Sequence, residues 1–347
     1  MALPAIAAAP ESCRSIADDA ARLICYDRAS GRIAPAATSP AEAEAGSSVV
    51  PIDVPDSPHA NAASRGWLNA DTDVLQTFAE RWELDRETKD GVLKVKPYQS
   101  VYVLPVSWRQ NINVNPCSPN PANCASGAGG SYQHTEAKFQ VSLKTKLWQD
   151  IFGSPLDLWA AYTQQSFWQV YDAANSRPFR ETDYQPEAWL TLPLSVGPQW
   201  LQWRMLNLGV VHQSNGQSDP LSRSWNRVYA TLGFTSGELS MYVKPWWRIQ
   251  ESPSSDNNPD IADYAGRIEL QAVYPYRANV FSATLHNNLR FSSSTPNRTS
   301  ALVSWAFPLF SDLHGYVQAY SGWADSLQNY NFRNAGIGIG VSLVELR

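Results

Sequence analysis

The feature that most restricts the fold of this chain is the alternation of apolar and polar residues from about residue 96 onward. Alternation is the period of a β-strand, because successive side chains point to opposite faces of a sheet. Twelve segments carry the pattern, and the region is therefore expected to be all-β. They cover residues 96–113, 134–149, 156–171, 186–195, 199–213, 223–234, 238–250, 262–275, 279–291, 299–310, 315–324 and 331–345.

The connections between these segments indicate which kind of β protein the chain forms. Short turns, such as SVGPQ and TSGE, follow every second segment, and longer polar loops, such as ESPSSDNNPD, follow the others. Short turns at one end and long loops at the other are typical of a transmembrane β-barrel. We therefore expect a 12-stranded antiparallel transmembrane β-barrel with an N-terminal periplasmic extension. A soluble β-sandwich is the alternative, although it gives no reason for this alternation.

The composition agrees with a membrane barrel. Charged residues make up 17% of the chain and aromatic residues 12%, and no run of 18 apolar residues occurs, which excludes a transmembrane helix. The net charge of −5 and the absence of a basic run argue against a nucleic-acid partner. The four cysteines fall in two close pairs, Cys13/Cys25 and Cys117/Cys124, which predict two local disulfides in an oxidising compartment. Zinc binding is the alternative, but no cluster with metal-ligand spacing surrounds either pair.

The N-terminal part divides into three segments before the barrel region, residues 96–347. Residues 1–33 predict a short helical segment closed by Cys13 and Cys25, and residues 34–65 a flexible linker rich in Pro, Ala and Ser. Residues 66–95 form a pre-barrel segment, with helical spacing from Leu68 to Asp85. The start, MALPAIAAAPESC, lacks a basic region and a long apolar core, so we expect a mature or engineered form of an exported protein.

One unusually polar stretch, HQSNGQSDPLSRSWNRVY, interrupts the apolar pattern between the fifth and sixth segments. In both segments the even-numbered positions are the apolar ones, so they are expected to face lipid. His212, Ser214 and Asn226 share this parity and are therefore predicted to lie together on the outer wall. Polar side chains on a lipid-facing wall are costly, which marks them as functional candidates.

These three residues can form a nucleophilic site. A hydroxyl nucleophile needs a base within hydrogen-bond reach and a third group that orients the base. Ser214, His212 and Asn226 supply these roles, but a neutral Asn stabilises an imidazolium less than Asp does, so a divalent cation is expected nearby. A His followed by a Ser also occurs by chance, and loop polarity alone explains HQSNG equally well. The other histidines, His59, His134, His286 and His314, lack this combination and are expected on the surface or in loops.

Two glycine motifs bear on other possible functions. The GIGIG of residues 336–340 lies inside an alternating segment with no helix after it, so strand packing is expected there rather than a nucleotide loop. No GxSxG motif occurs, which argues against an α/β-hydrolase.

HQSNG followed by SRSWNRVY resembles the signature of the outer-membrane phospholipase A family, as do YTQQSFWQ at 162–169 and RPFRETDYQPE at 177–187. The resemblance extends from about residue 96 to the C-terminus. It implies a twelve-stranded barrel in the bacterial outer membrane that hydrolyses the sn-1 and sn-2 acyl esters of phospholipids and lysophospholipids. It also implies that calcium is required and that homodimerisation activates the enzyme. The alternatives are a non-catalytic pore, a soluble esterase and a peptidase with the same triad.

The resemblance implies a role for individual residues. The nucleophile falls on Ser214, the base on His212 and the orienting amide on Asn226. Calcium ligands fall on Ser222, on the backbone of Gln217, and on Ser176 of the partner subunit, while Gln164 matches the polar residue at the dimer interface. The chain departs from the family pattern in three ways: Gln217 replaces the usual Arg, Leu346-Arg347 replaces a terminal aromatic residue, and the Cys13/Cys25 region extends beyond the family core.

Overall fold

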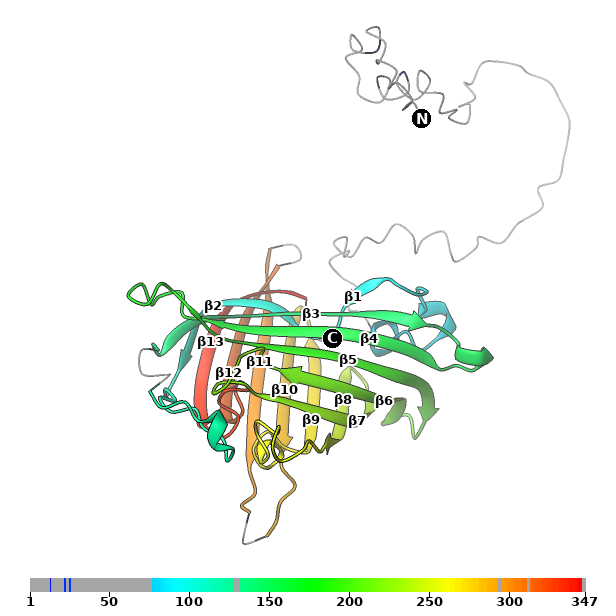
Figure 1. Cartoon of the computed structure of the whole chain (residues 1–347). Helices are drawn as coiled ribbons and strands as arrows, with labels where there is room; N and C mark the ends of the chain where they lie inside the picture. The colour runs from blue at the N-terminus through cyan, green and yellow to red at the C-terminus, as the bar shows by residue number, and fades with distance from the viewer. Residues whose placement is uncertain are drawn as a thin grey trace, which may run out of the picture. The chain divides into compact units, whose positions relative to one another are not determined.

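The computed structural model describes residues 77–127, 132–292, 295–310 and 313–344, together with Cys13, Arg22 and Cys25. In the barrel region each strand from β2 to β13 pairs antiparallel with the next, and β13 pairs with β2, which closes a twelve-stranded barrel (Figure 1). The predicted fold class is therefore confirmed. The strands are β1 (Val95–Pro97), β2 (Val101–Arg109), β3 (Thr135–Trp148), β4 (Asp157–Trp168), β5 (Phe179–Val196), β6 (Gln202–Ser214), β7 (Ser224–Ser236), β8 (Leu239–Ile249), β9 (Ile268–Tyr276), β10 (Asn279–Asn287), β11 (Thr299–Phe310), β12 (Leu313–Trp323) and β13 (Arg333–Val344).

The side chains are distributed as the alternation predicted, with apolar residues outside and polar residues inside. On β6, Leu208 and Val210 are 54% and 53% exposed, whereas the neighbouring Asn207 is only 2% exposed. Some of the charges inside the barrel are paired, as where the Lys146 amine contacts carboxylates of Glu83 and Asp157. An apolar outer wall around a polar interior is the arrangement of a barrel whose outer surface meets lipid. None of the helices in the described part of the chain is long and apolar enough to cross a bilayer.

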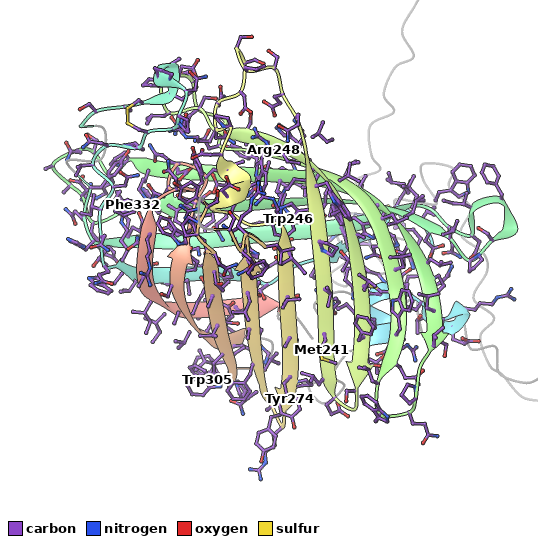
Figure 2. The ribbon with its side chains drawn as sticks, turned by 90° about the horizontal axis from the view of Figure 1, so that it is seen from below. Met241, Trp246, Arg248, Tyr274, Trp305 and Phe332 are labelled. Atoms are coloured by element: carbon purple, nitrogen blue, oxygen red, sulfur yellow. A yellow bond between two sulfur atoms is a disulfide. The ribbon has the colours of Figure 1, made fainter. Side chains whose placement is uncertain are left out.

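Loop lengths alternate between the two ends of the barrel, as expected. The turns at 197–201, 237–238 and 277–278 lie at one end, and long loops such as 110–134 and 250–267 lie at the other. Figure 2 shows Met241 and Tyr274 toward the turn end and Arg248 toward the loop end. The GIGIG segment lies within β13, as expected for strand packing. A Cβ at Gly340 would lie only 2.1 Å from the Val103 carbonyl oxygen, so β2 and β13 approach closely there.

Three strand boundaries differ most from the prediction. The first segment is divided into β1 and β2, because Tyr98 between them turns inward and stacks on Trp189 at 5.0 Å. β5 begins at Phe179 rather than at 186. The start of this strand is polar and shows no apolar alternation, because residues such as Arg180, which pairs with Glu136 at 2.9 Å, face the interior. β9 begins only at Ile268, because residues 261–263 form a 3-10 turn.

The segment before the barrel packs against its aromatic residues. Within the segment with predicted helical spacing, 68–85, the described residues form the short helix α2 (Phe78–Trp82), with a capping box between Thr77 and Glu80. This helix ends at Trp82 rather than at Asp85. Trp82 contacts Tyr98 and Trp189 with ring centroids 6.2 and 6.3 Å apart. Apart from Cys13, Arg22 and Cys25, residues 1–76 lie outside the described residues, so the segment boundaries there stay predictions. Both predicted disulfides, Cys13–Cys25 and Cys117–Cys124, are present.

Candidate active site

Strands β6 and β7 bring the predicted base and the predicted orienting amide together. Their register places His212 directly opposite Asn226, and His212 Nδ1 lies 2.8 Å from Asn226 Oδ1. Both side chains lie on the outer wall, where their neighbours Val210 and Val228 are 53% and 44% exposed. The pair therefore lies in apolar surroundings, in which a hydrogen bond gains strength from the weak competition of water.

The direction of this hydrogen bond determines the tautomer of the neutral imidazole. An amide oxygen only accepts, so Nδ1 of His212 carries a proton, and in the neutral ring Nε2 has the lone pair. Ser214 lies two residues along β6 and pairs across the sheet with Ser224. Among the described residues, the hydrogen bonds do not include one between the His212 ring and Ser214 Oγ. Such contacts tighten when substrate is bound.

A carboxylate that the sequence did not single out extends the pair. Asn226 Nδ2 donates to Glu251 Oε1 at 3.3 Å. This bond holds the amide with its nitrogen toward Glu251 and its oxygen toward His212. Glu251 lies in the 250–267 loop, which has no residue period from which its position beside Asn226 could be derived.

The 215–223 loop joins the two strands and is shaped by Asn215, which is 4% exposed. Asn215 Oδ1 accepts from the backbone N–H groups of Gln217 and Arg223 at 3.3 and 3.0 Å, and its Nδ2 donates to the Leu221 carbonyl at 2.9 Å. The Ser222 hydroxyl accepts from Asn257 Nδ2 at 2.7 Å. Burial lowers the pKa of the Arg223 guanidinium, and the nearby Tyr330 and Glu181 offset part of this effect by raising the pKa.

The donors of this loop fit a hard cation. They are oxygen atoms: the Ser222 hydroxyl, the backbone carbonyl of Gln217 and the carboxylate of Asp219, and oxygen is the donor that Ca²⁺ prefers. The described residues contain no cluster of three or more His, Cys, Asp or Glu placed to hold a metal. Ser176 lies in a different loop, between β4 and β5, where it is exposed and has a φ of +61°.

Gln164 lies on the outer face of β4, between Tyr162 and Ser166, and bonds to both at 3.1 and 3.3 Å. It lines an open hollow of about 490 Å³ on the outer wall. The hollow reaches from Gln164 to Gly216 and Gln217 of the 215–223 loop. Its other lining residues are Phe139, Ser166, Phe179, Glu181, Thr182, Tyr184 and Asn215. The predicted interface residue and a predicted cation donor thus border one hollow.

The other histidines do not join this site. His134 lies in the loop before β3, as expected, and His59 lies outside the described residues. The expectation is wrong for His286, which lies on β10 and lines the interior cavity. Its Nε2 is 2.8 Å from Glu269 Oε2, so a polar interior accommodates a histidine that an apolar core would exclude. His314 likewise lies on a strand, β12, rather than in a loop.

Comparison with known proteins gives a consistent result. The family model described as phospholipase A1 matches residues 78–343. The phospholipase A1 of Klebsiella pneumoniae is 36% identical over 259 residues, 74% of this chain and 85% of its own. A Neisseria meningitidis relative, which also carries phospholipase A1 in its name, is 34% identical over 96% of this chain and 90% of its own length.

Solved structures agree with the sequence relatives. Outer membrane phospholipase A from Escherichia coli superposes with a TM-score of 0.64 at 33% identity, covering 75% of this chain and 95% of that one. The calcium-bound dimer of the Salmonella typhi outer membrane phospholipase superposes with a TM-score of 0.67 at 32% identity, covering 78% of this chain and 99% of that one.

Proposed function

Because this chain belongs to the phospholipase A1 family, we propose that it hydrolyses acyl esters of phospholipids and lysophospholipids, at both the sn-1 and the sn-2 position, in a bacterial outer membrane. The observation that carries the proposal is the His212–Asn226 hydrogen bond of 2.8 Å, with Ser214 on the same strand of an apolar outer wall. A base oriented at this place serves a substrate that arrives from the bilayer.

In the proposed mechanism, Ser214 Oγ attacks the acyl carbonyl carbon while His212 Nε2 takes the hydroxyl proton. The Asn226 oxygen holds Nδ1–H and stabilises the imidazolium that forms, and Glu251 holds the Asn226 amide. His212 then gives the proton to the leaving alcohol oxygen, which leaves an acyl-serine. Water deprotonated by His212 attacks this ester, and the fatty acid departs as Ser214 regains its proton.

We propose that Ca²⁺ is the cofactor, held by Ser222, by the backbone carbonyl of Gln217 and by Ser176 of the partner subunit. When bound, it supplies positive charge that stabilises the oxyanion. The replacement of Arg by Gln217 leaves the backbone donor in place. Support comes from the oxygen donors of the 215–223 loop and from the calcium bound to the dimer of the Salmonella typhi relative.

We propose that the active form is a homodimer with Gln164 at its interface. An amide on a lipid-facing wall gains from a partner in a second subunit. The hollow that runs from Gln164 to Gln217 would then become a closed groove for an acyl chain. In this arrangement the long loops point away from the periplasm, and the active site faces the outer leaflet.

The test is hydrolysis of phospholipid and lysophospholipid in detergent micelles, with and without Ca²⁺. Ser214→Ala and His212→Ala should each lower the rate to near background. Asn279→Ala is a matched control, because the Asn279 side chain accepts from the Trp305 indole on β10 and β11, away from β6 and β7. Activity that survived both active-site substitutions would refute the proposed triad. Activity that a calcium chelator does not change would refute the proposed calcium requirement.

A further inference from the structure

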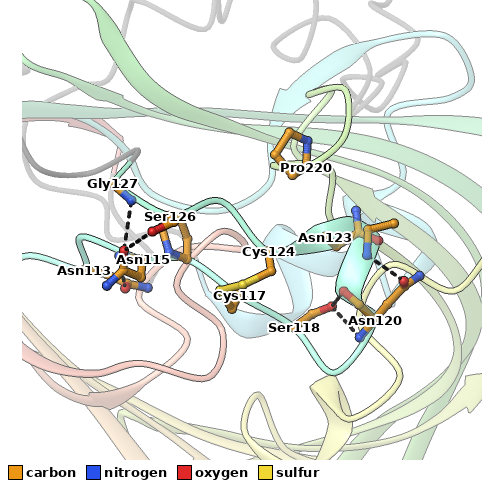
Figure 3. The surroundings of a disulfide bond; sticks show 12 residues. Asn113, Asn115, Cys117, Ser118, Asn120, Asn123, Cys124, Ser126, Gly127 and Pro220 are labelled. Atoms are coloured by element: carbon orange, nitrogen blue, oxygen red, sulfur yellow. Dashed lines mark hydrogen bonds between the residues drawn. A yellow bond between two sulfur atoms is a disulfide. The ribbon is translucent and has the colours of Figure 1, made fainter.

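The loop between β2 and β3 carries an element that the proposed mechanism does not use. The Cys117–Cys124 disulfide closes a ring of chain that includes the 3-10 turn Pro121–Asn123. We call residues 116–124 the disulfide ring. Figure 3 draws Pro220 of the 215–223 loop among the surroundings of this disulfide. The two segments therefore meet at the loop end of the barrel, although they are about a hundred residues apart in sequence.

Asn123 makes the first connection between them. Its side chain is only 1% exposed, and its Nδ2 donates to Asp219 Oδ1 at 2.7 Å and to the Ser222 carbonyl at 3.4 Å. Both acceptors belong to the loop that offers the proposed calcium donors. A buried amide so placed fixes the positions of the groups that it contacts.

Arg223 makes the second connection and is fully buried. Its Nη2 donates to the carbonyls of Asn123 and Pro116 in the disulfide ring at 2.9 and 3.3 Å. Its Nη1 donates to the carbonyls of Ser222 and Pro220 at 2.7 and 3.2 Å. One guanidinium thus joins two segments through four backbone oxygens, directly beside Ser222.

We propose that the disulfide ring positions the calcium-binding loop, with Asn123 as the positioning residue. This inference rests on the proposed function, because it concerns the same metal. Groups that hold metal ligands in place raise affinity without touching the metal. The disulfide restricts the ring, so that Asn123 is already in place before the ion binds.

The test compares Asn123→Leu, which keeps the branched shape and the number of side-chain heavy atoms but removes the donor, with wild type. Asn115→Leu is the matched control, since Asn115 lies just before the ring and its side chain bonds to Gly127 and Ser126. Calcium affinity is measured by calorimetric titration of Ca²⁺ into the refolded protein in micelles, and kcat at saturating Ca²⁺. Asn123→Leu should weaken calcium binding about 10- to 100-fold, with kcat at saturation unchanged. Asn115→Leu should behave as wild type.

A Cys117→Ser/Cys124→Ser variant gives a second test that leaves Asn123 in place. It should also weaken calcium binding, while heat-modifiable electrophoretic mobility shows that the barrel is folded. Calcium affinity within twofold of wild type in folded Asn123→Leu would overturn the positioning role and leave the proposed function intact. A wild type that neither binds nor requires calcium would overturn both.

Discussion

Replacement of Asn226 by Ala tests how much a neutral amide contributes to the proposed catalysis. Asn226 Oδ1 accepts from His212 Nδ1 at 2.8 Å, and this donor becomes charged when His212 takes the serine proton. A hydrogen bond to a charged group contributes about 1.5–3 kcal/mol. Since a tenfold change in rate corresponds to about 1.4 kcal/mol, kcat should fall roughly 10- to 150-fold. KM should change little, because the amide acts through its bonds to His212 and Glu251.

The assay is the steady-state hydrolysis of a chromogenic acyl ester in micelles at saturating Ca²⁺. Asn279→Ala again serves as the control for the loss of one outer-wall hydrogen bond. Asn226→Asp should be more active than Asn226→Ala, because a carboxylate also accepts from His212 Nδ1, but less active than wild type, because it cannot donate to Glu251. A kcat for Asn226→Ala within twofold of wild type, alongside an inactive Ser214→Ala, would show that the amide does not orient the base.

Three further outcomes are expected. Glu251→Leu should lower kcat about tenfold by releasing the Asn226 amide, whereas Glu251→Gln, which keeps an acceptor, should lower it less; equal rates for both variants and wild type in the same ester assay would contradict the role of Glu251. Gln164→Leu should weaken calcium-dependent dimerisation a few-fold, since an interfacial polar contact in lipid contributes about 0.6 kcal/mol; chemical cross-linking in micelles measures this, and an unchanged dimer fraction would argue against this interface. Trp82→Ala should destabilise the barrel by about 3–5 kcal/mol because it removes a buried ring between Tyr98 and Trp189; urea unfolding followed by tryptophan fluorescence tests it, and an unchanged midpoint would show that α2 adds no stability.

The sequence-based prediction agrees best with the structure at the outer wall of the barrel. The parity of Leu208, Val210 and His212 in the sequence already placed His212 on the apolar face, and the barrel has it there. The register of β6 against β7 across the 215–223 loop places His212 opposite Asn226. The alternation along each strand predicted that both residues lie on the outer face, and in the structure they meet.

The sequence by itself determined the strands from β2 to β13, their two faces and the juxtaposition of His212 with Asn226, because these depend on a period of two and on neighbours in the chain. It also paired the cysteines correctly, because each pair is close in sequence. The polar start of β5 was missed, because Arg180 is satisfied by Glu136, a partner on another strand.

Only the tertiary structure decided which distant groups support the site. Glu251 reaches Asn226, and Asn123 reaches Asp219, from loops that have no period and that meet only when the barrel closes. The inward turn of Tyr98 likewise depends on Trp189, which lies on another strand. Contacts between loops depend on how the closed barrel brings the ends of different strands together. A local sequence pattern carries no information about which loops become neighbours in this way.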